Sequence, residues 1–343
     1  MKQKLLSIVK VLLFLSLGIF LIWISVSKLT KKDFADISNA LKNARYGWII
    51  LSVFIGLLSH VVRAIRWRML LEPLHHRPKL STTFYAVMVG YLANYAVPRL
   101  GEASRCGVLS RYEKIPFAES LGTVLIERII DILVFFALVI LMLVLQFKTI
   151  YGFVKTTIFS ALGDKINHLS NEKIIGMLFI IGLFVFALIA LFLYRKKMKG
   201  VFFEKIKRIL KSFSEGVKTI RKLKRPFWFW FHSLLIWLLY YLMLQVCFFS
   251  LQQTTHLSIP EVLTAFIFGT LMVMITPGGI GAYPIAIKQV LLLYFVDANI
   301  GYTLGWLAWL SQFFTVLFFG LISLILLAVF NKRKNGNNTS VIA

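Results

Sequence analysis

The chain has 343 residues, of which 59% are hydrophobic and only 15% are charged, against roughly 25% charged residues in ordinary soluble domains. This composition excludes a soluble globular protein, a disordered protein and a disulfide-stabilised secreted scaffold. The 39 Lys and Arg residues outnumber the 14 Asp and Glu residues, which gives a formal charge of +25. In so apolar a chain, this excess indicates the cytoplasmic loops of a membrane protein rather than a nucleic-acid partner.

Six segments are apolar enough to cross a membrane as helices, for which about 20 residues are needed. They are residues 5–27, 48–65, 121–146, 174–194, 227–249 and 302–330. A shorter segment, residues 82–97, contains Gly90 and Asn94 and ends at Pro98. Another, residues 261–275, is separated from residues 280–296 by Pro277, Gly278 and Gly279. The sequence therefore predicts an all-α polytopic membrane protein with about six full spans and two broken or re-entrant helical elements, roughly eight hydrophobic segments in all.

The basic segment 195–226 sets the predicted orientation. It holds 13 Lys or Arg residues against Glu204 and Glu215, so we expect it on the cytoplasmic side. Its apolar residues recur at helical spacing, which favours a basic amphipathic helix on anionic headgroups over a solvated connector. Residues 332–334 (Lys-Arg-Lys) place the C-terminus on the same side. With the N-terminus also inside, residues 82–97 must enter the membrane and return.

The second broken element is expected to begin on the outer side. Two interrupted segments that enter from opposite faces point to a possible inverted repeat, with a substrate site where they meet.

Several charged residues lie inside or beside these apolar segments. Arg63 and Arg66 are three apart on one helical face, and Glu127 and Asp131 are four apart on another. At membrane depth each costs roughly 2.5–3.5 kcal/mol, so pairing or a wet cavity must offset the cost. We expect the carboxylates to pair with arginines. A structural ion-pair cluster and a cavity for an anionic headgroup both stay open, and the two are compatible.

The predicted site has two groups of residues. The candidate substrate-binding residues are Arg63, Arg66, Asn94, Arg99, Glu102, Arg105, Glu127, Arg128 and Asp131. The candidate gating residues, at the breaks, are Pro98, Gly101, Pro277, Gly278, Gly279 and Gly281. The His and Cys residues form no metal-ligand pattern and no ATPase-type phosphate-binding loop occurs, so we expect no metal, no cofactor and no direct use of ATP.

Four short motifs occur in order: Arg63-x2-Arg66-Trp67, Asn94-x3-Pro98-Arg99-x-Gly101-Glu102-x2-Arg105, Glu127-Arg128-x2-Asp131 and Pro277-Gly278-Gly279-Ile280-Gly281. The set resembles the transmembrane, flippase-like domain of lysylphosphatidylglycerol synthases, as a free-standing member. The resemblance implies a polytopic fold with re-entrant segments and a role in moving a polar lipid between leaflets. The soluble aminoacyltransferase domain of those synthases has no counterpart, so aminoacyl transfer is not expected.

One departure from the family pattern concerns the residues after Gly281. Family members often carry a Glu there, whereas this chain has Ala282, Tyr283 and Pro284. Lys288, in the apolar run that follows, has no evident partner in the sequence.

We therefore expect a single flippase-like transmembrane domain over residues 1–343, with halves 1–194 and 227–331, the basic helix 195–226 and a cytoplasmic tail 332–343. The expected function is a lipid flippase or carrier of a phospholipid or lipid-linked precursor, without enzymatic activity. Its partners would be lipids with an anionic or phosphate-bearing headgroup, not nucleic acid. It would lie in the cell membrane, as in the bacterial inner membrane, with both termini cytoplasmic. The alternatives are a membrane enzyme acting on a polyprenyl-phosphate or phospholipid, and a structural or partner-binding membrane protein.

Overall fold

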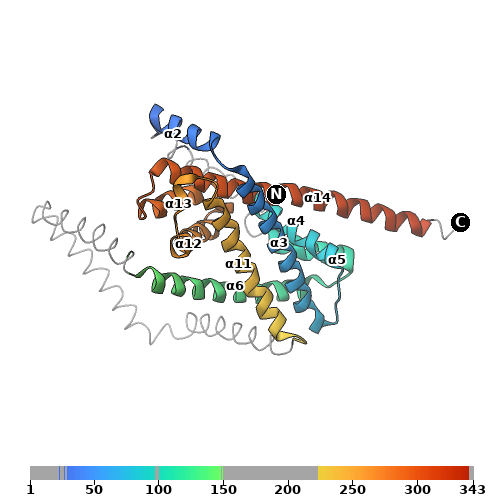
Figure 1. The fold of residues 1–343 in the computed structure, drawn as a ribbon. Helices are drawn as coiled ribbons and strands as arrows, with labels where there is room; N and C mark the ends of the chain where they lie inside the picture. The colour runs from blue at the N-terminus through green and yellow to red at the C-terminus, as the bar shows by residue number, and fades with distance from the viewer. Residues whose placement is uncertain are drawn as a thin grey trace, which may run out of the picture. The chain divides into compact units, whose positions relative to one another are not determined.

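A computed structural model of the protein describes residues 29–96, 100–147, 149 and 223–339, together with Trp23 and Ser27, the side chains of Ala96, Pro277 and residues 330–339 excepted. Within these ranges all regular structure is helical. Their contacts join residues from both halves of the sequence into one compact unit (Figure 1). The predicted span 5–27, apart from Trp23 and Ser27, the span 174–194 and nearly all of the basic segment 195–226 lie outside the described residues.

Four helices correspond to predicted spans, and all four are long and apolar enough to cross a membrane. They are α3 (Tyr46–Leu71), α6 (Phe117–Leu145), α11 (Pro226–Phe248) and α14 (Ala298–Thr339). The predicted all-α polytopic membrane fold is thereby confirmed. Helix α3 continues beyond the predicted end at residue 65, because Arg66, the first charged residue that follows, is buried and paired instead of ending the helix in water.

Helices α3 and α11 run antiparallel, side by side (Figure 1). Near the start of α3, the Ser52 hydroxyl donates to the Met243 carbonyl at 2.9 Å. Near its end, Arg66 Nη1 donates to the Ser233 hydroxyl at 3.2 Å. These two contacts define two ends of the unit. The "α2 end" holds α2 (Lys31–Lys42), the start of α3 and the end of α11, and the "basic end" holds the end of α3, the short helix η1 (Glu72–Leu74) and the start of α11.

A first helical hairpin rises from the basic end. It consists of α4 (Leu80–Ala96) and α5 (Leu100–Glu113). The backbone N–H of Lys79, before α4, donates to the Glu113 carboxylate at 3.3 Å, so the hairpin begins and ends at the same place. Sequence reasoning assigned no helix to the polar residues of α5. That helix lacks an apolar run of its own and is supported by packing along α4.

A second hairpin descends from the α2 end. It comprises α12 (Ile259–Ile275), the 3-10 turn η4 (Pro277–Gly279) and α13 (Ala282–Leu292), and it follows α11 through the short helix η3 (Gln252–Thr254). A capping box between Ser258 and Glu261 starts α12. The break is built on glycine: Gly278, Gly279 and Gly281 all have positive φ angles, of 60°, 74° and 71°, which residues with a Cβ adopt only with strain.

The tips of the two hairpins meet. A Cβ added at Gly278 would lie 2.6 Å from the ring of Tyr95, at the end of α4. Helix α14 passes both tips: Trp309 Nε1 donates to the Gly278 carbonyl at 2.7 Å, and the Phe313 ring lies 5.4 Å from that of Tyr95. Two interrupted elements therefore enter from opposite ends of the α3–α11 pair and touch. Their entry into a membrane stays a prediction.

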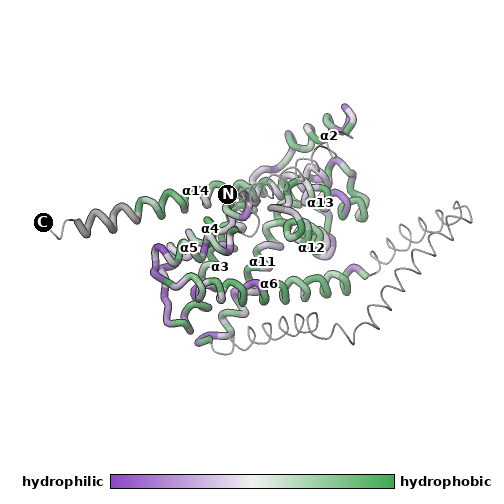
Figure 2. The backbone as a smooth tube through the Cα atoms, turned by 180° about the vertical axis from the view of Figure 1, so that it is seen from behind, coloured by the Kyte–Doolittle hydropathy of each residue, from purple (hydrophilic) through white to green (hydrophobic). Residues whose placement is uncertain are grey.

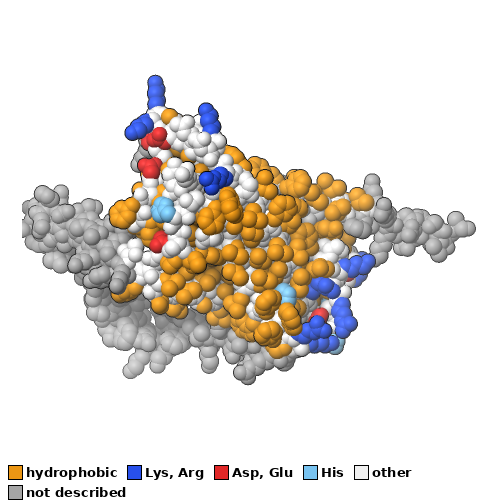
Figure 3. Space-filling model, viewed as in Figure 1, with side chains coloured by type: hydrophobic (Ala, Val, Ile, Leu, Met, Phe, Trp, Pro, Cys, Tyr) orange, Lys and Arg blue, Asp and Glu red, His pale blue; other side chains and the backbone are white. Residues whose placement is uncertain are grey.

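The surface reflects the same division into ends. In Figure 2 the hydrophilic stretches gather at α2 and around the basic end, with hydrophobic backbone between them. Figure 3 shows hydrophobic side chains over the middle of the visible face, between charged residues at the α2 end and a group of Lys and Arg at the basic end. This distribution is what a membrane-spanning protein requires.

Lys288, on α13, lies at the α2 end, near Asp33. Asp33 on α2 accepts a hydrogen bond from Asn299 Nδ2 at 2.8 Å, which ties α2 to the start of α14. This bond, the backbone and hydroxyl of Thr30, and the positive charge of Lys288 together lower the pKa of Asp33 to about 2. Lys288 is thus close enough to Asp33 for its positive charge to act on that carboxylate. Pro284, about one helical turn earlier on α13, packs on α14, where a Cβ at Gly305 would lie 2.6 Å from the Pro284 Cα.

Candidate functional site

The last third of α3 carries two arginines into the interior. Arg63 and Arg66 lie three residues apart and therefore share one face of the helix. Both are buried, with exposed fractions of 3% and 0%. Two guanidinium groups this deep require carboxylates, bound anions or aromatic faces around them.

Glu127, on the first half of α6, supplies one of these carboxylates. It is fully buried and pairs with three arginines. One oxygen accepts from Arg63 and lies 3.1 Å from Arg66 Nη2, and the other accepts from Arg105 Nη2 at 3.0 Å. A single carboxylate thus joins α3 and α5 to α6.

Asp131 follows one turn later on the same face of α6. Its oxygens lie 3.0 Å from Arg63 Nη1 and 2.8 Å from Arg66 Nη1. The pairing of the α6 carboxylates with arginines, expected from the sequence, is therefore present. We call the five buried residues Arg63, Arg66, Arg105, Glu127 and Asp131 the arginine cluster.

Arg105 reaches the cluster from the first hairpin. It is 4% exposed, and its guanidinium lies 4.7 Å from the centroid of the Trp67 ring, within cation–π range. The Trp67 Nε1 in turn donates to the Thr123 hydroxyl on α6 at 2.9 Å. The hairpin is thereby held to both spans by charge and by an aromatic face.

An outer ion pair borders the cluster. Arg128 Nη2 lies 3.0 Å from Glu102 Oε1, and these side chains are 38% and 26% exposed. Arg128 Nη1 also lies 4.0 Å from Asp131. The pair marks the side on which the cluster approaches the surface.

The arginine cluster has more positive than negative charge. Three guanidinium groups share two carboxylates, and the outer Arg128–Glu102 pair adds no net charge. Three buried donors, Nε and Nη2 of Arg66 and Nε of Arg105, and one acceptor, Asp131 Oδ1, have no hydrogen-bond partner among the described residues. Arg66 Nη2 and Asp131 Oδ1 still lie within ion-pair distance of Glu127 and Arg66, respectively, so the two Nε groups are the donors left without any partner within the described ranges. A buried, partly unsatisfied cation set is able to bind an anion.

The remaining predicted residues lie at the hairpin tips. Asn94 Oδ1 accepts from the backbone N–H of Gly101 at 2.7 Å across the turn, so its side chain holds the first tip closed. A Cβ at Gly101 would lie 2.2 Å from the Gly90 carbonyl. Pro98 and Arg99 lie outside the described residues. The glycines of the second break and the backbone of Pro277 form the other tip, and none of them contributes to the ion pairs of the arginine cluster.

Sequence reasoning missed an aromatic wall on the cluster. Tyr240 of α11 accepts from Arg63 Nε at 3.3 Å, and the Tyr91 and Tyr240 hydroxyls are 3.1 Å apart. The ring of His60 lies 4.6 Å from that of Tyr91. Tyr91 was within reach of prediction, because it is three residues before Asn94 on the broken segment. Tyr240 was not, because α11 is rich in aromatic residues throughout its length.

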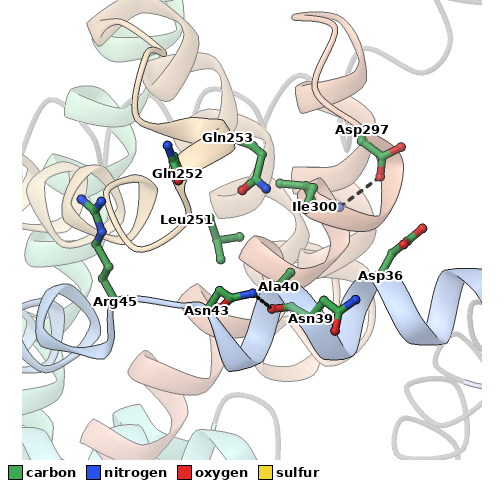
Figure 4. A pocket seen from close by; sticks show the side chains of 10 residues that line it. All are labelled: Asp36, Asn39, Ala40, Asn43, Arg45, Leu251, Gln252, Gln253, Asp297 and Ile300. Atoms are coloured by element: carbon green, nitrogen blue, oxygen red, sulfur yellow. Dashed lines mark hydrogen bonds between the residues drawn. The ribbon is translucent and has the colours of Figure 1, made fainter.

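A separate pocket of about 510 Å³ opens at the α2 end (Figure 4). Its polar lining comes mainly from α2, the start of α3 and the η3 turn, and includes Asn39, Asn43, Arg45, Gln252 and Gln253. Asn43 Nδ2 donates to the Asn39 carbonyl at 3.0 Å, and Asp297 accepts from the backbone N–H groups that open α14. Sequence reasoning named none of these residues.

Comparison with known proteins agrees with this architecture. The pattern of the family described as "Lysylphosphatidylglycerol synthase TM region" matches residues 7–322. A relative from Methanocaldococcus jannaschii, described as a UPF0104 membrane protein, is 25% identical over 178 residues, which cover 51% of this chain and 47% of that protein. The alignment thus spans about half of the relative's length, and no solved structure matches the chain. Because the family pattern extends over most of the sequence, the protein belongs to the lysylphosphatidylglycerol synthase transmembrane-region family.

Proposed function

We propose that the protein carries a phosphate-bearing lipid between the two leaflets of the membrane, and that the arginine cluster receives the headgroup. The observation that supports this proposal is the excess of buried positive charge, three guanidinium groups against two carboxylates. An unbalanced charge at such depth is costly unless a counter-ion shares the site. A phosphodiester headgroup carries one negative charge and would balance the cluster.

The donor geometry suits a phosphate. Guanidinium groups bind phosphate through two parallel hydrogen bonds, and arginine keeps its charge when buried. The unpartnered Nε donors of Arg66 and Arg105 would be satisfied by phosphate oxygens. The carboxylates of Glu127 and Asp131 would then hold the arginines in position, so the structural and the binding roles of the cluster coincide.

The outer pair of Arg128 and Glu102 is the natural entrance. Leu125 and Ile132, on either side of Arg128 along α6, are 59% and 49% exposed. A headgroup that parts Arg128 from Glu102 would enter the cluster while its acyl chains stay against these apolar residues. The lipid would then need to desolvate only its headgroup.

The two hairpins would dip into the membrane from opposite faces, as inverted-repeat carriers do. The glycines at the second tip would let that tip move against Tyr95, so that the cluster opens alternately to the two sides. The basic end would face the cytoplasm by the positive-inside rule, with both termini on that side of the cell membrane. No part of this cycle uses ATP.

Transport is tested in liposomes that contain the purified protein and a fluorescent phosphatidylglycerol, with the outer leaflet bleached by dithionite. We expect bleaching beyond the outer-leaflet fraction. Arg128→Gln should slow it about tenfold, the equivalent of one charged hydrogen bond. Arg111→Gln, an exposed arginine on α5, is the matched control and should leave the rate unchanged.

Two outcomes decide against the proposal. Bleaching equal to that of protein-free liposomes, for anionic and zwitterionic probes alike and with correctly folded protein, would exclude a carrier. Conversion of the probe to a new species, detected by mass spectrometry of the extracted lipid, would favour a membrane enzyme acting on a lipid phosphate.

A further inference from the structure

A second cavity lies at the basic end, apart from the arginine cluster. It has a volume of about 420 Å³ and is lined by Arg68, Glu72, Arg77, Lys224 and Arg225. We call it the basic pocket. Its residues come from the last turn of α3, from η1 and the loop after it, and from the two residues before α11. The antiparallel pairing of α3 and α11 brings them together.

The pocket carries a strong and uncompensated charge. Four cations and one carboxylate leave three net positive charges, and none of the five residues forms an ion pair with another described residue. Arg68 Nε is buried without a hydrogen-bond partner in the described part of the chain. The C-terminal dipole of α3 is equivalent to about half a negative charge, far less than the charge gathered here. An anion is the missing counterpart.

The level of the pocket relative to the membrane surface favours a lipid headgroup over a soluble anion. Directly after Arg225, the first turns of α11 expose a group of large aromatic side chains. These are Phe227, Trp228, Trp230 and Phe231, with exposed fractions between 38% and 73%. A group with exposed Trp side chains, here Trp228 and Trp230, is typical of the level of lipid headgroups in membrane proteins. The basic pocket, one residue beyond them, therefore lies at headgroup depth and not in bulk solvent.

The pocket is chemically distinct from the arginine cluster. Arg66 is fully buried and pairs with Glu127 and Asp131, whereas Arg68, two residues later, lines the pocket. The cluster has one excess positive charge and the pocket has three. A singly charged phosphodiester matches the first, and a headgroup with more than one negative charge matches the second.

We propose that the basic pocket binds a polyanionic lipid headgroup, such as a phosphate monoester, from the leaflet at this end of the protein. The lipid bound here is not the cargo of the arginine cluster. It anchors the ends of α3 and α11 to the membrane surface, where each cation near an anionic surface adds to the affinity.

The test is lipid binding to the full chain in neutral detergent, followed by native mass spectrometry with dioctanoyl phosphatidic acid as the probe. We expect phosphatidic acid to bind more tightly than phosphatidylglycerol, and phosphatidylcholine to bind least. The triple variant Arg77→Gln, Lys224→Gln, Arg225→Gln removes three exposed cations and should weaken binding at least about tenfold. Glu72→Gln removes the only carboxylate of the pocket and should tighten binding.

The matched control is the triple variant Lys31→Gln, Lys32→Gln, Lys42→Gln on α2, which makes the same change in charge at the opposite end. It should alter binding less than about twofold. Equal losses in both triple variants would mean non-specific attraction and would overturn the proposal. So would displacement of the lipid by inorganic phosphate or glycerol 3-phosphate at the same concentration, because the ligand would then be a soluble phosphate.

The outcome is independent of transport. Arg128→Gln, which tests the arginine cluster, should leave phosphatidic acid binding unchanged. Loss of transport with retained binding would therefore count against the carrier proposal alone, and loss of specific binding with retained transport would count against the basic pocket alone.

Discussion

The two hairpins have similar backbone paths but different chemistry. The first, α4–α5, closes through a glycine pair and the Asn94 side chain, and sends Arg105 into a buried charge cluster. The second, α12–α13, closes through three glycines of positive φ and packs its tip against aromatic rings. A buried charge thus belongs to the first hairpin, and a glycine break of positive φ belongs to the second. In the proposed carrier, the first hairpin would therefore serve binding and the second would serve movement.

The largest expected loss of stability comes from a substitution in the arginine cluster. Glu127→Gln leaves Arg105 without a carboxylate partner among the described residues, and leaves Arg63 and Arg66 with Asp131 alone. Removing one partner of a buried ion pair lowers the free energy of unfolding by about 3–5 kcal/mol. Chemical unfolding of the wild type and the variant in detergent micelles measures this loss. Glu119→Gln, on the same helix but 45% exposed, should cost less than about 1 kcal/mol. Equal losses of unfolding free energy in the two variants would show that water reaches the arginine cluster despite its burial.

The second effect concerns the closure of the first hairpin. In Gly101→Ala, the new methyl group meets the Gly90 backbone at 2.2 Å. Because backbone cannot move aside cheaply, we expect a loss of about 1–3 kcal/mol in unfolding free energy. Gly107→Ala on the same helix has open space around its Cβ and should instead gain roughly 0.5–1 kcal/mol from helix propensity. The idea of a tight hairpin fails if both changes act alike.

The third effect tests whether the hairpins touch. Gly278→Ala places a methyl group on a residue with φ of 60° and 2.6 Å from the Tyr95 ring, for a loss of about 1–2 kcal/mol from backbone conformation alone. In a Tyr95→Ala background the ring contact is gone, so the same change should cost less. A coupling energy of at least about 0.5 kcal/mol is expected from the double-mutant cycle. If the losses of unfolding free energy in the two single variants add up to that of the double variant, the two tips do not interact.

The smallest effect is at the α2 end, where the second hairpin is anchored. The pKa of Asp33 is lowered to about 2 by Asn299, Thr30 and Lys288. A carboxylate whose pKa falls on folding stabilises the protein above its unfolded pKa, so this contribution is lost as the pH drops from about 4 to about 2. The difference in melting temperature between the wild type and Asp33→Asn should shrink over that range. Asp36→Asn on the same helix is the control, and a difference independent of pH would contradict the prediction.

Much of the fold was predictable because apolar length is a local property of the sequence. The segments 48–65, 121–146, 227–249 and 302–330 correspond to α3, α6, α11 and α14. The breaks at Pro98 and at Pro277–Gly279 predicted two broken or re-entrant elements, because proline and glycine interrupt a helix locally. Helix α5 was not predictable from hydropathy, because its polar residues are satisfied by contacts with other elements and not by its own composition.

The site divides in the same way. The sequence by itself determined that Arg63, Arg66, Glu127 and Asp131 lie on helical faces at a depth where they need partners, because helical spacing and the cost of burying charge are local facts. Only the tertiary structure decided which residues are their partners. It shows that Arg105 joins the cluster, whereas Asn94 closes a turn. It also shows that Tyr91 and Tyr240 line the cluster. Ion pairs between residues up to 68 positions apart depend on how the helices pack, and the excess of one positive charge becomes visible only when that packing is known.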